Sequence, residues 1–108
     1  MKLVVGGAAQ GKETFTKTIC NGSRIIRDYH CIIREQLEAG LNPMEEAERL
    51  YRIEPEVVIV TDEVGNGVIP VDAFEREYRR AAGRTHCKLA ELSDEVYRVI
   101  CGIGQRIK

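Results

Sequence analysis

Residues 6–13 read GGAAQGKE and directly follow the apolar run LVV at residues 3–5. The stretch matches the phosphate-binding loop (P-loop) pattern G-x-x-x-x-G-K-[ST] at seven of its eight positions. Glycines let backbone N–H groups turn inward around a phosphate, and the following helix N-terminus adds positive potential. A chance glycine-rich turn is the alternative, but the strand in front favours a true phosphate loop. The predicted nucleotide-binding residues here are Gly6, Gly7, Ala8, Ala9, Gln10, Gly11, Lys12 and Glu13.

The last two residues of the pattern bear on catalysis. In the pattern, the lysine reaches the β- and γ-phosphates and the hydroxyl after it touches Mg²⁺. Lys12 is present, but Glu13 puts a carboxylate where the hydroxyl should be. Two interpretations stay open. Either the site has altered metal chemistry, or the chain is a degenerate P-loop module that binds a nucleotide or a partner without turnover.

Composition restricts the classes of protein to consider. The chain has 108 residues, of which 44% are hydrophobic and 31% charged, as is typical of one globular domain. A formal net charge of -1 gives no electrostatic reason to bind nucleic acid or an anionic membrane. No apolar run approaches the ~20 residues of a membrane span, and no signal peptide opens the chain. We expect a single nucleotide-binding domain over residues 1–108, located in the cytoplasm, with neither nucleic acid nor membrane as a partner.

Apolar runs predict three core strands, near residues 2–5, 56–61 and 96–101. The runs are continuous rather than alternating, which is typical of strands covered by helices on both faces. Helical patterns alternate with them, near residues 12–19, 28–40, 42–51 and 72–92. This alternation predicts an α/β fold, a P-loop-type three-layer sandwich with a small, mainly parallel sheet.

Capping residues indicate where two of the helices begin. Asn42 precedes Pro43, a helix cap followed by proline at the first helical position. Asp72 and Glu75 have the spacing of a capping box. Gly83 interrupts the last helix, where glycine costs about 1 kcal/mol relative to alanine. We therefore expect a packing or functional reason for this glycine.

Acidic residues follow the second predicted strand, in the stretch TDEVGNGVIP at residues 61–70. An apolar strand that ends in carboxylates resembles a Walker B element, in which a carboxylate at the strand tip holds Mg²⁺. Gly65 and Gly67 would then allow a tight loop. Asp62 and Glu63 could equally form a solvated turn, and the pattern alone favours neither interpretation.

The remaining candidates lie in predicted helices. His30 and His86 are the two histidines of the chain. Either could be a nucleophile, or simply an exposed or core-bordering side chain. Arg84, next to Gly83, is a candidate phosphate contact, and the alternative is an exposed helix charge.

Three stretches together are similar to a known family. GGAAQGK, VTDEVGNGVIP and AGRTHCKLAELSDEVYRVICGIGQRIK resemble the bifunctional adenosylcobinamide kinase / adenosylcobinamide-phosphate guanylyltransferase family of cobalamin assembly. The resemblance implies a P-loop enzyme that uses ATP or GTP with Mg²⁺ and phosphorylates the aminopropanol hydroxyl of a cobinamide-like substrate. It further implies transfer of GMP from GTP to that phosphate through a guanylylated histidine. It also implies a homo-oligomer, a trimer with sites between subunits.

Several positions depart from the family pattern. Glu13 replaces Ser or Thr, Asp62 stands where the family has Asn, and His86-Cys87 replaces Asn-Gln. The chain is shorter in the middle, where family members have a strand with an acidic residue near the phosphate loop. By order along the chain, His30 is the nearest equivalent of the guanylylated histidine. The catalytic candidates are thus Lys12, His30 and Glu63, the Mg²⁺ ligands Asp62 and Glu13, and the further phosphate contact Arg84.

The charged residues of the site support both interpretations, the degenerate module and the enzyme. A carboxylate at Glu13 repels a triphosphate unless a metal intervenes, which favours the degenerate module. The intact Lys12 and the additional acid at Asp62 favour an enzyme, a kinase or guanylyltransferase. We predict that Glu13 and Asp62 together form an acidic Mg²⁺ site, which would make nucleotide binding unusually metal-dependent.

Overall fold

A five-stranded sheet forms the centre of the molecule in the computed structural model, which describes residues 1–64 and 72–108. The strands are β1 (Lys2–Gly6), β2 (Ile25–Ile26), β3 (Val58–Asp62), β4 (Glu95–Ile100) and β5 (Ile103–Arg106). Their order is β2-β3-β1-β4-β5. All neighbouring pairs are parallel except β4 and β5, which are antiparallel. The predicted α/β class with a mainly parallel sheet is confirmed.

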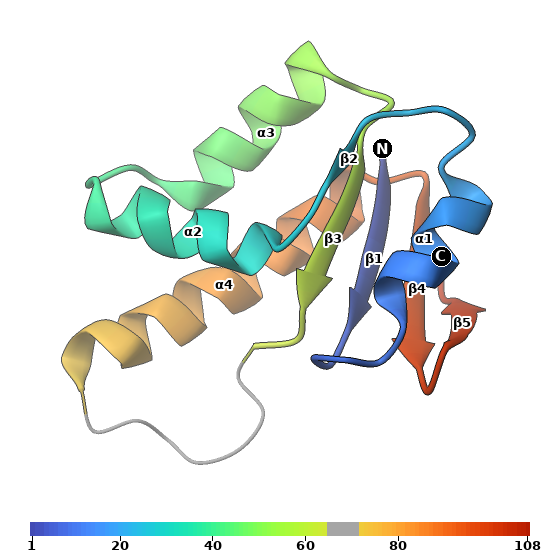
Figure 1. Cartoon of the computed structure of the whole chain (residues 1–108). Coiled ribbons are helices and arrows are strands. Elements are labelled where there is room, and N and C mark those ends of the chain that lie inside the picture. Colours follow the sequence, from blue (N-terminus) through green and yellow to red (C-terminus); the bar gives the residue numbers. More distant parts are fainter. Residues whose placement is uncertain (65–71) are drawn as a thin grey trace.

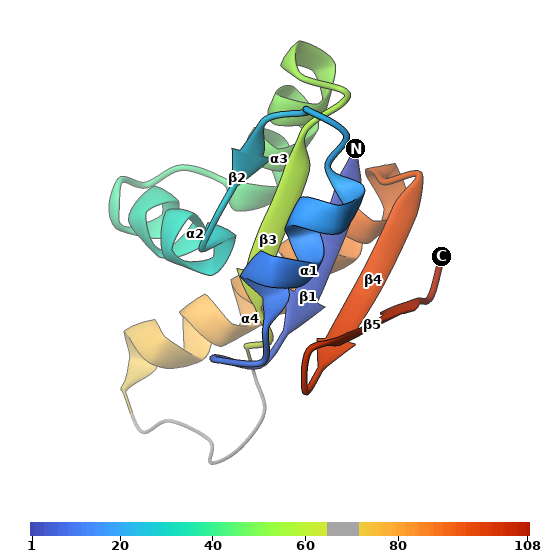
Figure 2. The same ribbon diagram turned by 45° about the vertical axis from the view of Figure 1, so that its right-hand side comes forward.

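Helices cover both faces of this sheet, so the molecule has three layers (Figures 1 and 2). In the described ranges the helices are α1 (Lys12–Ile19), α2 (Tyr29–Glu38), α3 (Pro43–Ile53) and α4 (Ala73–Leu92). Helix α1 lies on one face, and α2, α3 and α4 lie on the other. Within the described part of the chain, every helix is too short or too polar to cross a membrane.

The core consists of two clusters, one on each face of the sheet. Leu3, Ile59 and Val96 belong to the cluster that packs on α2, α3 and α4. Their neighbours in the strands, such as Val4 and Val58, are fully buried on the other face, against α1. Because successive strand residues point to opposite faces, continuous apolar strands fill both layers. This is the arrangement that the apolar runs predict.

Two strands were not predicted, so the expectation of three strands was wrong. β2 has only two residues, too few for a pattern, and it exists through its parallel pairing with β3. β2 lies next to β3, and Asp28 follows β2 two residues later. β5 is an exposed edge strand with the sequence IGQR, which contains no apolar run. It follows the turn Cys101-Gly102, whose φ angles of 50° and 77° are typical of a two-residue hairpin.

Asn42 and Asp72 are confirmed as helix N-caps, while the Glu75 carboxylate pairs with Arg34, so the reciprocal half of the capping box stays a prediction. The Asn42 side chain accepts a hydrogen bond from the N–H of Met44 at 3.0 Å, and the Asp72 side chain accepts from the N–H of Glu75 at 3.2 Å. A Cβ added at Gly83 would meet nothing within 4 Å, so packing inside the described chain does not require this glycine. The predicted loop through Gly65 and Gly67 lies outside the described residues.

Candidate functional site

The backbone of the loop between β1 and α1, residues 7–11, requires glycine just before the loop and at its last residue. A Cβ on Gly6 would lie 2.6 Å from the carbonyl oxygen of Val99, so only glycine fits between the strands there. Gly11 has a φ of 87° and directly precedes α1. This left-handed conformation is easy for glycine and strained for other residues. The two glycines of the motif therefore set how the chain leaves β1 and enters α1.

The turn between β4 and β5 braces this loop. The backbone N–H of Cys101 donates to Oε1 of Gln10 at 2.8 Å, and the N–H of Gly102 donates to the Gln10 carbonyl oxygen at 2.7 Å. Sequence reasoning did not find this contact, because it joins residues about 90 positions apart. It fixes the middle of the loop to the C-terminal hairpin.

Lys12 and Asp62 meet at the carboxyl ends of β1 and β3. Gly6 and Asp62 are register partners in these parallel strands, so the residue at the tip of β3 faces the loop. Lys12 Nζ lies 2.7 Å from Asp62 Oδ1 and donates to the carbonyl oxygen of Gly7 at 2.6 Å. The structure thus brings together two of the predicted site residues. Ligands of open α/β sheets bind at this edge.

A cavity of about 390 Å³ opens between the loop and the ends of β2 and β3, and we call it the loop cavity. Its volume falls within the range of known small-molecule sites, ~300–1,000 Å³. It is lined by Ala8, Ala9, Gln10, Gly11, Lys12, Glu13, Arg27, Asp28, Val60 and Asp62. Most of the predicted nucleotide-binding residues therefore share one cavity, together with two charged residues that were not predicted, Arg27 and Asp28.

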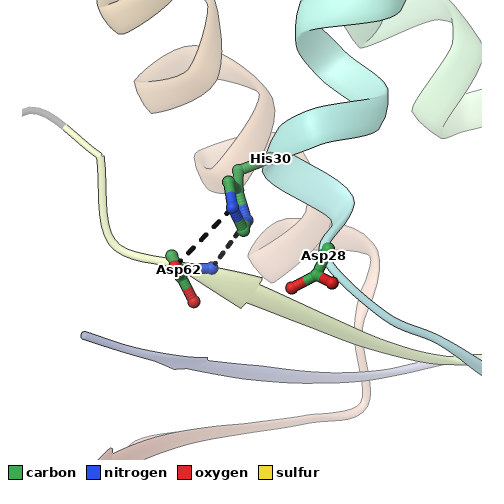
Figure 3. Close-up of side chains that lie close together, drawn as sticks. All are labelled: Asp28, His30 and Asp62. Atoms are coloured by element: carbon green, nitrogen blue, oxygen red, sulfur yellow. Dashed lines mark hydrogen bonds and ion pairs between the residues drawn. The ribbon is translucent and has the colours of Figure 1, made fainter. Parts of the chain in front are cut away.

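Asp28, His30 and Asp62 form a cluster in this region (Figure 3). One potential ligand atom from each residue lies within 4.8 Å of the other two. Asp28 directly precedes α2 but makes no capping hydrogen bond to it. Its carboxylate is instead directed to the cluster. An acid after the β-branched pair Ile25-Ile26 could have indicated this residue, by the same reasoning that indicated Asp62.

His30 holds Asp62 from the side of α2. Its Nδ1 accepts a hydrogen bond from the backbone N–H of Asp62 at 3.1 Å, and its Nε2 lies 3.6 Å from Asp62 Oδ2 (Figure 3). A neutral imidazole has one acceptor nitrogen, so the contact at Nδ1 places the proton on Nε2, next to the carboxylate. In this geometry His30 orients Asp62. A nucleophilic role through Nε2 would need the other tautomer.

Glu13 lies at the edge of the loop cavity and is held by Arg27. Nε of Arg27 donates to both carboxylate oxygens of Glu13 at 2.8 Å, and Nη2 lies 2.8 Å from Oε1. The hydrogen bonds from Arg27 lower the pKa of the Glu13 carboxyl, so it stays ionised. Glu13 and Asp62 thus line the same cavity, each paired with a different cation. The joint Mg²⁺ site of these two acids stays a prediction.

Three other candidates lie outside the described lining of the loop cavity. Glu63 Oε1 accepts from Nε of Arg98 at 3.0 Å. His86 Nε2 lies 3.0 Å from the hydroxyl of Thr61, and burial lowers its pKa to about 4, so this imidazole is neutral. Arg84 lines a different cavity, which also includes residues of α2 and α3. These three residues are not among those that line the loop cavity, and their roles stay predictions.

Comparison with known proteins identifies the family. Residues 29–107 match the family described as cobinamide kinase / cobinamide phosphate guanyltransferase. The match covers most of the chain, so the chain belongs to this family. The resemblance carried by the sequence motifs is confirmed.

Two curated relatives support the assignment. The bifunctional adenosylcobalamin biosynthesis protein CobU of Salmonella typhimurium is 46% identical over 57 residues, which is 53% of this chain and 32% of that protein. The protein of the same name from Escherichia coli K12 is 44% identical over 57 residues, with the same shares. The alignments therefore span about a third of the length of these relatives. The family match begins at α2, so the loop at residues 7–11 and Asp28 are evidence independent of it.

Proposed function

We propose that this chain is a P-loop-type enzyme that transfers the terminal phosphate of ATP or GTP to a hydroxyl of a cobinamide-like substrate. This is the kinase reaction that the family name describes. The observation that carries the proposal is the meeting of Lys12, Asp28 and Asp62 in the loop cavity. A cation and two carboxylates beside a glycine-rich loop suit a nucleotide that arrives with a divalent metal.

Phosphate binding falls to the loop and to Lys12. Backbone N–H groups at the start of α1 and the helix dipole attract the phosphates. The Lys12 ammonium is held near the loop by Asp62 and by the Gly7 carbonyl oxygen. When a triphosphate enters, the same ammonium exchanges these partners for β- and γ-phosphate oxygens. The ion pair with Asp62 thus keeps Lys12 in place for the nucleotide.

The donor set of the cluster fits Mg²⁺. Carboxylate oxygens are the ligands that this ion prefers, and Asp28 and Asp62 supply them from two neighbouring strand ends. A bound Mg²⁺ would neutralise charge on the phosphates. His30 holds Asp62 by the geometry described above, so the carboxylate keeps its orientation. Glu13 stays a proposed additional ligand, which would require it to leave Arg27.

Transfer to the hydroxyl depends mainly on positioning, because phosphoryl transfer demands little covalent chemistry from the protein. A carboxylate of the cavity that does not bind the metal could accept the hydroxyl proton. Glu63 is the further predicted catalytic residue. Its carboxylate accepts from Arg98 through Oε1, and a carboxylate has further acceptor sites.

The alternative is a module that binds a nucleotide or a partner without turnover, and one observation favours it. Position 13 offers a carboxylate paired with Arg27 instead of the hydroxyl that normally touches the metal. The proposed enzyme therefore relies on Asp28 and Asp62 for the metal. A cytoplasmic location, a trimeric assembly and a single nucleotide-binding domain over residues 1–108 are also proposed, by analogy with the family.

Calorimetric titration with ATP and GTP, with and without Mg²⁺, tests the binding step. We expect wild type to bind in Mg²⁺ and Lys12→Ala to lose measurable binding, because this ammonium would contact the phosphates. The matched control is Lys17→Ala, an exposed lysine on α1 away from the cavity lining, which should bind as wild type does. Equal affinity of wild type and Lys12→Ala would overturn the proposal. Binding without phosphate transfer to cobinamide would support the module.

A further inference from the structure

Two cationic side chains line the loop cavity, and the proposed function uses only Lys12. The second is Arg27, which directly follows β2 and lines the loop cavity. It is about half exposed, with a side-chain exposure of 48%. An arginine on the rim of a phosphate site is suited to recognise phosphate oxygens, since its planar group presents several N–H donors at once.

Glu13 restrains this guanidinium on the side of α1. The carboxylate takes the Nε–H and one N–H of Nη2, with all three N···O distances at 2.8 Å. A guanidinium has five N–H donors, so three are not engaged by Glu13. Arg27 can therefore keep its contact to Glu13 and bind a phosphate at the same time. Glu13 stands at the second position of α1, next to Lys12, so it holds Arg27 close to the phosphate loop.

The net negative charge of the cavity lining means that a second cation would favour phosphate binding. Its lining carries two positive side chains, Lys12 and Arg27, and three carboxylates, Glu13, Asp28 and Asp62. The balance of -1 repels a triphosphate unless a metal and both cations engage it. The pair of Arg27 and Glu13 is exposed, and exposed ion pairs are weak. The guanidinium can therefore adjust toward a ligand at small energetic cost.

We propose that Arg27 is a phosphate-binding residue of this chain, and that Glu13 is the positioning residue that holds it at the rim of the loop cavity. The inference rests on the proposed nucleotide site and names a further contact within it. It also gives position 13 a role that a threonine or serine could not supply, because only a carboxylate can bind the guanidinium through two oxygens.

The first test compares two neighbouring arginines. Arg27→Gln should weaken binding of MgATP about tenfold or more, the typical effect of losing a charge-assisted hydrogen bond. It should weaken MgGTP by the same factor, since the contact is to phosphate and not to the base. Arg24→Gln is the matched control, because Arg24 is exposed, flanks the other end of β2, pairs with the half-buried Glu54 and does not line the cavity. Arg24→Gln should keep wild-type affinity.

The second test is a double-mutant cycle that separates positioning from competition. Glu13→Gln removes a negative charge in either background, but it removes the partner of Arg27 only when Arg27 is present. If Glu13 positions Arg27, Glu13→Gln should improve MgATP affinity in the Arg27→Gln background and improve it less, or reduce it, in wild type. A larger improvement in wild type would mean that Glu13 competes with phosphate for the guanidinium, and the positioning role would be wrong.

Failure of this inference is distinguishable from failure of the proposed function. If wild type binds neither MgATP nor MgGTP, the nucleotide site itself is refuted. If wild type binds and Lys12→Ala does not, but Arg27→Gln retains wild-type affinity, the nucleotide site stands and the role of Arg27 is refuted. A thermal melt of each variant should show similar stability for Arg27→Gln and Arg24→Gln, so that only the affinity separates them.

Discussion

Replacing Asp62 by asparagine should reduce the effect of Mg²⁺ on nucleotide binding. Asp62 has two roles in the proposed site, as the partner that holds Lys12 at 2.7 Å and as a metal ligand beside Asp28. Asparagine has nearly the same shape, so Asp62→Asn changes charge and leaves the packing of β3 intact. Without metal, the variant removes a carboxylate that repels the phosphates. With metal, it removes a ligand.

The size of the first effect follows from Coulomb's law. A phosphate charge near Lys12 would lie about 5 Å from the Asp62 carboxylate. In the partly exposed environment of this pair the repulsion is roughly 1–2 kcal/mol, or about tenfold in affinity. Metal-free binding of ATP should therefore become about tenfold tighter in Asp62→Asn. In Mg²⁺, binding should become weaker than in wild type, since Asp28 is left as the main carboxylate for the ion.

The assay is calorimetric titration of ATP in excess MgCl₂ and, separately, in EDTA. Asp94→Asn is a suitable control, because Asp94 is an exposed carboxylate paired with the N-terminal amine and lies outside the lining of the loop cavity. Its affinity should match wild type in both buffers. If Asp62→Asn shifts affinity in the same direction in both buffers, Asp62 does not act as a metal ligand and the reasoning is refuted.

Three further predictions concern Glu13 and the histidines. Glu13→Thr, which restores the family residue, should tighten metal-free binding and shrink the effect of Mg²⁺; an unchanged metal effect in calorimetry would contradict this. Incubation with GTP and Mg²⁺ should leave the protein mass unchanged, because the Nδ1 lone pair of His30 accepts from the Asp62 N–H; a GMP adduct that disappears in His30→Ala would restore the guanylylated histidine. Burial depresses the pKa of His86 to about 4, so the unfolded chain binds more protons between pH 6.5 and 4 and stability falls as pH decreases through this window. His86→Asn should reduce that loss, which reaches about 3 kcal/mol at most, and equal acid sensitivity of the two proteins in thermal melts would refute it.

The parts of the site that depend on neighbouring residues in the sequence could be predicted. An apolar strand, two glycines and a lysine predicted the arrangement of β1, the loop and α1, because each residue there has a local reason for its identity. Asp62 was a candidate as an acid at the end of a buried strand, although the pattern alone left a solvated turn equally open. These residues meet because parallel strands end at the same edge of the sheet, which the alternation of strands and helices already implied.

The features of the site that were not predicted arise from contacts between segments distant in the sequence. β2 is two residues long and is defined by its pairing with β3, so no predicted strand placed Arg27 and Asp28 at the cavity. The pairing of Glu13 with Arg27 joins α1 to the end of β2, 14 positions apart, and no periodicity predicts it. The brace from the β4–β5 turn to Gln10 likewise depends on where the C-terminal hairpin folds. Tertiary pairing, rather than propensity, determined these features.

Transfer of labelled γ-phosphate from ATP or GTP to cobinamide, in Mg²⁺, tests the central claim most directly. The wild-type protein should form phosphorylated cobinamide, and Lys12→Ala and a double variant of Asp28→Asn with Asp62→Asn should form none above background. Lys17→Ala should retain wild-type turnover. If wild type binds the nucleotide but leaves cobinamide unlabelled with both ATP and GTP, the chain is a binding module and the kinase assignment is contradicted.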